Sequence, residues 1–181
     1  MSTLREKTCC FTGHRTIAPA RLEPLLENLN MEILWLISHG ITNFWAGGAL
    51  GFDTLAALSV LRFRADGSPI RLHMALPCRE QTRYWKSRDI EVYNDILMRA
   101  DSIKYISDHF YGGVMHQRNR FMVDQSSYCV CFYDHEQAKA TKSGGSGTLY
   151  TVNYARKHGL TLINLCDEPP DDGQLEFDFT V

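Results

Sequence analysis

Residues 43–64 read NFWAGGALGFDTLAALSVLRFR, and this stretch decides the class of fold. It begins with a short apolar and aromatic run at 43–46, which predicts a buried β-strand. Three glycines follow within 47–51, and glycine is the residue that tight turns and close backbone approaches favour. The remainder, 52–64, carries apolar residues on nearly every side, which predicts a well-buried helix. A strand, a glycine loop and a buried helix in this order are typical of α/β proteins.

The same alternation continues on both sides of this segment. Apolar, β-prone runs predict strands, and apolar residues at helical spacing predict helices. The predicted strands are 7–12, 43–46, 70–76, 102–106, 128–133 and 160–165. The predicted helices are 19–39, 52–64, 84–99, 114–125 and a last one that ends near 158. The pattern implies a Rossmann-like three-layer αβα fold with a mostly parallel sheet and right-handed crossovers.

We expect a single domain followed by a tail. The chain has 181 residues, and one domain typically contains about 100–200. All the predicted elements lie within 1–166, which we interpret as the domain. Residues 167–181 are acidic and contain prolines, so they are predicted to form a flexible tail.

The composition argues against several classes of protein. The chain contains 19 Lys+Arg and 21 Asp+Glu, and a net charge of −2 does not favour strong non-specific nucleic-acid binding. No apolar run approaches the roughly 18–20 residues of a membrane-spanning helix, and the N-terminus does not resemble a secretory signal. The 6 cysteines form no Cys-x-x-Cys pair, which favours buried, reduced thiols in the cytoplasm. The 7 histidines show no metal-ligand spacing, so we expect no metal and no cofactor.

Three loops rich in small residues follow predicted strands. They are 12–15 (TGHR), 47–53 (GGALGFD) and 144–148 (GGSGT), and such loops let backbone N–H groups approach a phosphate. None of them matches the dinucleotide fingerprint or the Walker phosphate loop. Parallel folds gather the carboxyl ends of their strands at one edge, where ligands bind. The three loops together therefore predict an anion or nucleotide pocket at that edge.

Three further positions leave alternatives open. Arg118 could pair with a phosphate or a carboxylate through its planar guanidinium, or it could face solvent while Met115, Phe121 and Met122 pack inward. Asp53 is predicted to be the N-cap of the helix that follows it, although it could also act at a site. Asp134 ends a strand, where it could hydrogen-bond a ribose or close a turn.

The motifs together resemble the SLOG superfamily, which includes the Lonely-guy phosphoribohydrolases, the DNA-processing protein A family and the YpsA-like proteins. Residues 115–122 look like the Lonely-guy motif M-H-E-R-K-x-x-M, and 144–148 look like the core of P-G-G-x-G-T-x-x-E. Residues 48–53 look like the G-x-A-x-G-I-D segment of the DNA-processing proteins. The opening FTGHR, and Trp85 after Pro77, are most similar to the YpsA-like branch. The resemblance implies a nucleotide-binding Rossmann-like fold and a homo-oligomer.

The chain departs from the Lonely-guy pattern at several positions. Thr151 stands where the resemblance implies a catalytic Glu, Asn119 replaces a Lys, and Ser143 replaces the Pro before the glycines. Cleavage of an N-glycosidic bond uses a carboxylate to stabilise charge or activate water. Hydrolysis here would need Asp53 or Asp134 as a substitute, so no catalytic residue is assigned.

Two other segments carry alternatives of their own. The segment 83–88 holds two arginines, Tyr84 and Trp85, which could stack on a base or could reflect a helix that packs its Trp into the core. In the tail, the peptide QLEFDF from Gln174 to Phe179 faintly resembles peptides that dock into sliding clamps. It would also suit strand addition to a sheet edge, or it could simply be a weakly ordered end.

The function predicted from these observations is binding of a nucleotide or nucleotide-derived ligand by a SLOG-type domain that acts as a sensor or regulator. The alternatives are a nucleoside-monophosphate phosphoribohydrolase-like N-glycosidase and a single-strand DNA-binding module. The DNA-binding alternative needs several scattered arginines to converge in the fold. The candidate ligand-binding residues are Gly13, His14, Arg15, Gly47, Gly48, Gly51, Asp53, Arg118, Asn119, Asp134, Gly144, Gly145, Ser146, Gly147 and Thr148.

Overall fold

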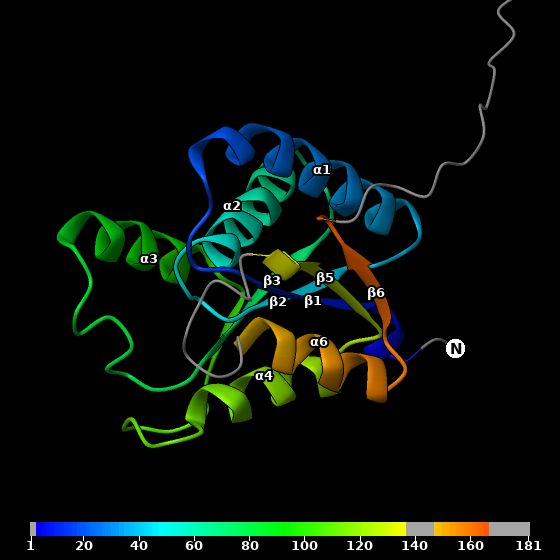
Figure 1. The fold of residues 1–181 in the computed structure, drawn as a ribbon. Coiled ribbons are helices and arrows are strands. Elements are labelled where there is room, and N and C mark those ends of the chain that lie inside the picture. The colour runs from blue at the N-terminus through cyan, green and yellow to red at the C-terminus, as the bar shows by residue number, and fades with distance from the viewer. Residues whose placement is uncertain (1–2, 137–146, 167–181) are drawn as a thin grey trace, which may run out of the picture.

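Six parallel strands form one sheet in the order β4-β3-β2-β1-β5-β6 (Figure 1). The computed structural model describes residues 3–136 and 147–166. The strands are β1 (Thr8–Gly13), β2 (Asn43–Ala46), β3 (Arg71–Leu76), β4 (Ser102–Tyr105), β5 (Tyr128–Phe132) and β6 (Thr161–Asn164). Every strand pair in this part of the chain is parallel, so the predicted α/β fold class is confirmed.

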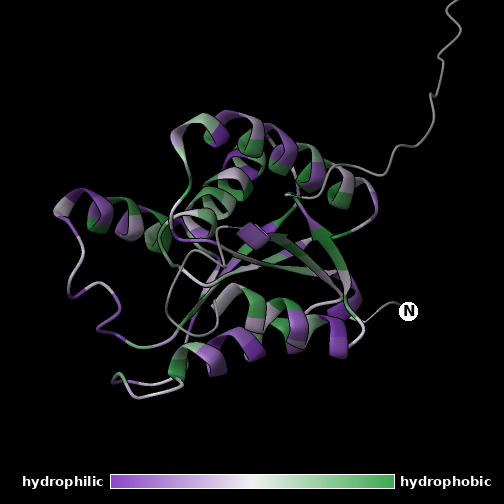
Figure 2. Cartoon of the chain, viewed as in Figure 1, coloured by the Kyte–Doolittle hydropathy of each residue, from purple (hydrophilic) through white to green (hydrophobic). Residues whose placement is uncertain are grey.

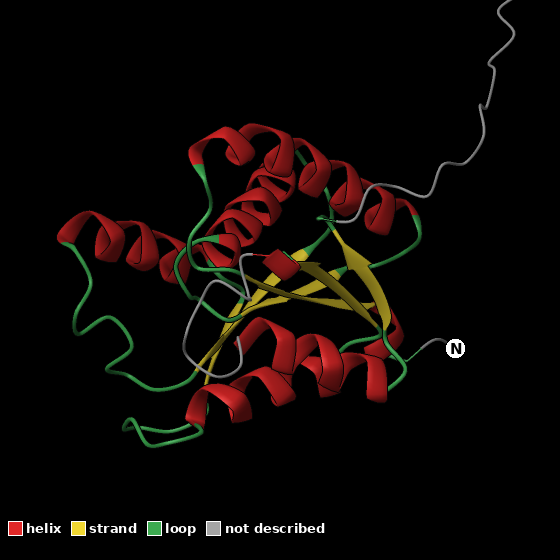
Figure 3. Ribbon diagram, in the orientation of Figure 1, coloured by secondary structure: helices red, strands yellow, loops and turns green. Residues whose placement is uncertain are grey.

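Helices cover both faces of the sheet and complete the three layers (Figure 3). The helices are α1 (Pro19–Ser38), α2 (Phe52–Ala65), α3 (Ser87–Arg99), α4 (Val114–Asp124) and α6 (Gly147–Lys157), and a 3-10 turn, η1 (Arg5–Lys7), precedes β1. Helices α1, α2 and α3 lie on one face, whereas α4 and α6 lie on the other. This is the Rossmann-like arrangement that the alternating pattern predicts.

The strand order reverses beside β1. From β1 the chain moves outward through β2 and β3 to β4, and it then returns to place β5 on the opposite side of β1. The loops that leave β1 and β5 therefore diverge to opposite faces of the sheet. In open parallel sheets this divergence leaves a crevice at the carboxyl ends of the strands.

A hydrophobic core lies on each face of the sheet. On β1, Cys9 and Phe11 pack toward α1 and α2, whereas Cys10 packs toward α4 and α6, because successive side chains point to opposite faces. Strand β5 is buried on both faces, as its continuous apolar run predicts. Figure 2 shows the helices with hydrophobic residues toward the sheet and hydrophilic residues outward. Helix α2 is buried along most of its length, which agrees with its lack of a polar face.

The largest difference from the predicted element bounds is at the start of α3. The prediction begins this helix at residue 84, but it begins at Ser87. The backbone before it forms turns, in which the N–H of Trp85 donates to the carbonyl of Thr82 at 2.9 Å. The ring of Trp85 packs edge-to-face on Tyr93 of α3, with 5.4 Å between centroids. Trp85 therefore packs against the helix from the preceding turn and is not part of it.

Some predictions fall outside the described residues. They concern Gly144, Gly145 and Ser146 of the third glycine loop, most of the loop before it, and the tail 167–181 with its peptide from Gln174 to Phe179. Among the helices of the described ranges, none is long and apolar enough to cross a membrane.

Candidate ligand-binding site

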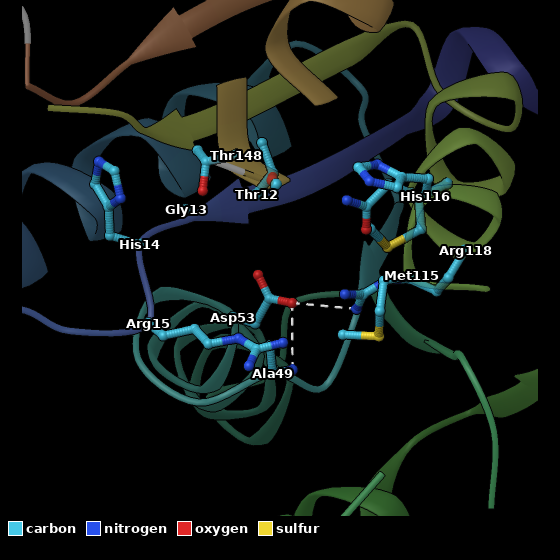
Figure 4. Close-up of a pocket in the computed structure, with 13 residues that line it drawn as sticks. Thr12, Gly13, His14, Arg15, Ala49, Asp53, Met115, His116, Arg118 and Thr148 are labelled. Carbon is cyan, nitrogen blue, oxygen red and sulfur yellow. Dashed lines mark hydrogen bonds and ion pairs between the residues drawn. The ribbon is translucent and has the colours of Figure 1, made fainter. Parts of the chain in front are cut away.

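A cavity of about 320 Å³ lies at the carboxyl end of β1, beside the point where the strand order reverses. Its walls come from the end of β1 and the loop after it, the loop into α2, helix α4 and the first turn of α6 (Figure 4). The lining residues are Thr12, Gly13, His14, Arg15, Ala49, Asp53, Met115, His116, Arg118, Asn119, Met122, Gly147 and Thr148. The fold thus brings together residues from all four sequence segments in which a site was predicted.

An ion pair between Asp53 and Arg118 lies at this cavity. Oδ2 of Asp53 and Nη1 of Arg118 are 3.5 Å apart, and both side chains are buried. Burial raises the pKa of Asp53 above its ordinary value and lowers the pKa of Arg118, because each charged form loses its hydration. Nε of Arg118 has no hydrogen-bond partner among the described residues. Since an unpaired buried donor is costly, Arg118 is suited to receive a ligand oxygen.

The loop between β2 and α2 surrounds the Asp53 carboxylate with backbone donors. The N–H of Ala49 donates to Oδ2 at 3.3 Å, and the N–H of Gly47 is close enough to this carboxylate to lower its pKa. The prediction that Asp53 is the N-cap of α2 is wrong, because that position belongs to Gly51. Gly51 has a φ of 77°, and a side chain there would collide with the carbonyl group of Arg15. Only glycine fits this entry to the helix, and Asp53 follows it with its carboxylate turned inward.

The glycines of this loop have structural roles of their own. A Cβ atom on Gly47 would overlap the guanidinium of Arg118 and would lie 2.7 Å from Oδ2 of Asp53. Gly48 has a φ of 66°, in the left-handed region that favours glycine. Neither these two glycines nor Gly51 lines the cavity. Their direct contact with a ligand stays a prediction.

His14 forms one wall of the cavity in a fixed orientation. Its Nε2 accepts a hydrogen bond from the N–H of Asp134 at 2.9 Å, and its ring stacks on Tyr133. Burial lowers the pKa of His14 below its ordinary value, because the imidazolium would lose its hydration. The ring is therefore held neutral with its other nitrogen protonated, so it presents a neutral surface to the cavity.

Asp134 does not line the cavity. Its carboxylate forms an ion pair with Arg21 of α1, and it accepts a hydrogen bond from the N–H of Glu136 at 2.8 Å. The second contact closes a turn after β5. Of the two roles left open for Asp134, closing a turn fits the geometry, and its hydrogen bond to a ribose stays a prediction.

Two features make the cavity electrostatically positive. The Arg15 side chain points from the loop after β1 toward Asp53 (Figure 4), so two guanidinium groups, those of Arg15 and Arg118, surround one carboxylate. Helix α6 begins at Gly147, and both Gly147 and Thr148 line the cavity. The amino-terminal end of a helix carries a partial positive charge. The site is therefore suited to an anion.

Sequence comparison agrees with this architecture. The sequence model of the YpsA family, described as the YspA SLOG family, matches residues 12–165. The chain belongs to this family. It is 31% identical over 154 residues to a UPF0398 protein of Halalkalibacterium halodurans, covering 80% of this chain and 82% of that protein. It is 28% identical over 151 residues to the SPbeta prophage-derived protein YoqJ of Bacillus subtilis, covering 74% and 84% of the two chains.

Solved structures of DNA processing protein A share the fold. The Helicobacter pylori protein superposes with a TM-score of 0.57 at 19% identity, over 86% of this chain and 63% of that one. The Streptococcus pneumoniae protein superposes with a TM-score of 0.60 at 13% identity, over 88% of this chain and 50% of that one. The SLOG chain thus spans 50% to 63% of the length of these proteins.

The position of the expected Lonely-guy Glu has a structural role in this SLOG protein. Oγ1 of Thr151 donates to the carbonyl of Gly147 at 2.8 Å, and it accepts a hydrogen bond from Nδ2 of Asn119 at 2.7 Å. Both side chains are buried. This chain of hydrogen bonds ties α4 to the first turn of α6. Asn119 and Thr151 thus hold two walls of the cavity in place.

Sequence reasoning did not assign five of the lining residues. They are Thr12, Ala49, Met115, His116 and Met122. Helical spacing was the available signal for two of them, because residues three before and four after Arg118 lie on its face of α4. Met115 and Met122 occupy those positions, and they line the cavity together with Arg118, which is buried and does not face solvent.

The arginines that a DNA-binding module would need do not gather in one place. Arg62 and Arg64 lie in the last turn of α2 and Arg71 begins β3, whereas the other three follow the opposite end of β3. Those three are Arg79, Arg83 and Arg88. In addition, within 3–136 and 147–166 no three His, Cys, Asp or Glu side chains are grouped to hold a metal ion.

Proposed function

We propose that this SLOG domain binds a small nucleotide-type anion in the cavity at the end of β1 and acts as a sensor or regulator. The observation that carries the proposal is the guanidinium of Arg118. Residue Arg118 is 4% exposed and lines the cavity, and its Nε has no hydrogen-bond partner within the described ranges. A phosphate oxygen is the acceptor that such a donor favours.

The surroundings support the same ligand class. Arg15 adds a second positive charge, and the amino-terminal end of α6, whose first residues line the cavity, adds the partial positive charge of the helix. A volume of about 320 Å³ suits a small ligand. The neutral ring of His14 and the side chains of Met115 and Met122 offer apolar surface for the rest of the molecule.

Binding without turnover is the better-supported form of the proposal. Asp53 is the one carboxylate among the residues that line the cavity, and it is engaged by Arg118 and by backbone N–H groups. Thr151, at the position of the Lonely-guy Glu, donates its hydroxyl proton to Gly147. Glycosidic cleavage needs a carboxylate free to stabilise charge or activate water, and this arrangement offers none among the described residues.

Isothermal titration with adenosine monophosphate, adenosine diphosphate, ADP-ribose, ribose 5-phosphate and adenosine tests the proposal. We expect the phosphorylated compounds to bind and adenosine to bind much more weakly. Arg15→Ala should weaken binding by about tenfold, since it removes one charge-assisted contact from an exposed side chain that the fold does not need. Arg71→Ala is the matched control, because this exposed arginine begins β3 at the opposite end of the sheet.

The possible outcomes separate the candidate functions. If none of the five compounds binds, or if wild type and Arg15→Ala bind them equally well, the proposed site is contradicted. Release of free adenine from adenosine monophosphate would favour the phosphoribohydrolase alternative. DNA processing protein A of Helicobacter pylori binds single-stranded DNA. A salt-sensitive mobility shift with a single-stranded oligonucleotide would favour the DNA-binding alternative for this chain.

A further inference from the structure

The Asp53 carboxylate lies where an anionic ligand would be expected to bind. The N–H of Ala49 donates to it, the nearby N–H of Gly47 lowers its pKa, and Nη1 of Arg118 is 3.5 Å from Oδ2. Figure 4 shows Arg15 pointing toward the same carboxylate from the other side. Glycine-loop N–H groups and arginine side chains are the donors that proteins use for phosphate. Asp53 therefore occupies some of the N–H donors and positive charge that would otherwise bind a phosphate.

The contacts of Asp53 are long enough for a second anion to compete for the same donors. The N–H of Ala49 donates over 3.3 Å and the ion pair with Arg118 spans 3.5 Å, both longer than a strong charge-assisted hydrogen bond. Nε of Arg118 remains unpaired among the described residues. The two guanidinium groups of Arg15 and Arg118 also outnumber the single carboxylate. A second anion is thus attracted to the cavity, but it must come close to Asp53.

We propose that Asp53 is an internal competing anion, so that the cavity takes up a phosphate or another oxyanion together with one proton from solvent. This inference rests on the proposed function of the same site. The proton moves to a carboxylate oxygen of Asp53, and no covalent bond to the ligand forms or breaks. The neutral carboxyl group can then donate its O–H to an oxygen of the ligand, and the repulsion between two anions becomes a hydrogen bond.

The charges around Asp53 are consistent with this exchange. The titratable groups at the site are Arg118 and His116 of α4, Arg15 and the neutral His14 of the loop after β1, and Tyr93 of α3, which stays a neutral phenol because burial raises its pKa. The first turn of α6 begins with Gly147 and carries no charged side chain. The arginines and the N–H groups lower the pKa of Asp53, but burial raises it by more. A nearby dianion would raise it further.

Titration with sulfate isolates the contribution of the protein, because sulfate remains a dianion from about pH 5 to about pH 8. We expect the affinity of the wild type for sulfate to increase as the pH falls. Asp53→Asn should bind sulfate about tenfold more tightly at the upper pH, with little dependence on pH, because the competing charge is gone. Asp66→Asn is the matched control, since Asp66 is exposed at the other end of α2 and should leave the wild-type behaviour unchanged.

Protonation of a histidine could also make sulfate affinity depend on pH. Two histidine variants distinguish that effect from protonation of Asp53. His14→Gln and His116→Gln should each keep the increase in sulfate affinity at low pH. If the increase disappears in either variant and persists in Asp53→Asn, the inference is overturned. It is also overturned if Asp53→Asn binds sulfate more weakly than wild type, since Asp53 would then only position Arg118.

A measurement on the wild type alone covers the case in which Asp53→Asn does not fold. Calorimetric binding of sulfate near pH 8, in two buffers with different ionisation enthalpies, reports the protons taken up. We expect an uptake that approaches one proton per sulfate. Binding with no proton uptake overturns the role of Asp53 and leaves the anion site intact. Absence of binding by sulfate and by the nucleotide panel at every pH overturns the proposed function as well.

Discussion

The guanidinium of Arg118 crosses the backbone at Gly47 so closely that any side chain at this position would overlap it. The two residues come from different motifs, the glycine loop after β2 and the helix α4. Their contact joins the two motifs into one structural unit, because only glycine leaves space for the arginine at this position. Asp53 completes the unit, because its Oδ2 would lie 2.7 Å from the same Cβ atom.

Gly47→Ala should displace Arg118 and separate it from Asp53. We expect the free energy of unfolding to decrease by about 1–3 kcal/mol, as in other overpacked interiors, and anion binding to be lost. Chemical denaturation and the nucleotide titration check these two effects. Gly112→Ala is the control, because a Cβ atom at Gly112 meets nothing within 4 Å. Equal stability of the two variants would contradict the tight packing at Gly47.

Arg118→Met should destabilise the protein because it leaves the Asp53 carboxylate buried without its partner. The expected loss at neutral pH is about 3–5 kcal/mol. Removal of Arg118 raises the pKa of Asp53 further, so the loss should shrink as the pH falls and Asp53 becomes neutral. Urea denaturation at several pH values measures this trend.

A partly exposed ion pair elsewhere in the protein serves as the control for Arg118→Met. Arg64 and Asp101 form an ion pair at 2.5 Å, with about a third of each side chain exposed. Arg64→Met should cost about 1 kcal/mol or less, since water screens this pair. The double variant Asp53→Asn with Arg118→Met should be more stable than Arg118→Met alone, because no unpaired charge remains. A double variant as unstable as the single one would show that lost packing, not charge, causes the effect.

Thr151→Val should break the link between α4 and α6. Valine keeps the shape of threonine but leaves Nδ2 of Asn119 without its acceptor at 2.7 Å. The expected loss of stability is about 1–3 kcal/mol, measured by denaturation. Thr151→Ser keeps the hydroxyl group and should retain the hydrogen bonds to Asn119 and Gly147. If serine and valine cost the same, the hydrogen-bond chain contributes nothing and only the volume of the side chain matters.

His14 should make the protein less stable in mild acid. Burial lowers the pKa of His14 from 6.5, so below that value the unfolded chain binds more protons than the folded one. The free energy of unfolding therefore decreases as the pH falls from 6.5 through the lowered pKa. His14→Gln should flatten this decrease, as measured by denaturation across the window. His73→Gln should act in the same direction, because burial also lowers the pKa of His73.

Periodicity predicted the elements of this fold because each helix and strand carries its own signal. Helix α2 is apolar on nearly every side and proved to be buried, and β5 is apolar throughout and is covered on both faces. The predicted start of α3 is three residues too early, because neither Trp85 nor its neighbours in the sequence are helix-breaking residues. Their turn is stabilised by the contact of Trp85 with Tyr93, which depends on packing across the chain.

The sequence by itself determined that this is a parallel α/β protein of the SLOG family, and it predicted the gathering of loops at one edge of the sheet that the structure shows for 12–15, 47–53 and the start of α6. Only the tertiary structure decided what Asp53 does. An aspartate two residues after a glycine, at the start of a helix, looks like a cap from the sequence alone. The fold instead places it within 3.5 Å of Arg118, which comes from the opposite face of the sheet. Burial then determines the pKa of both groups, and burial is a property of the assembled layers that local sequence does not encode.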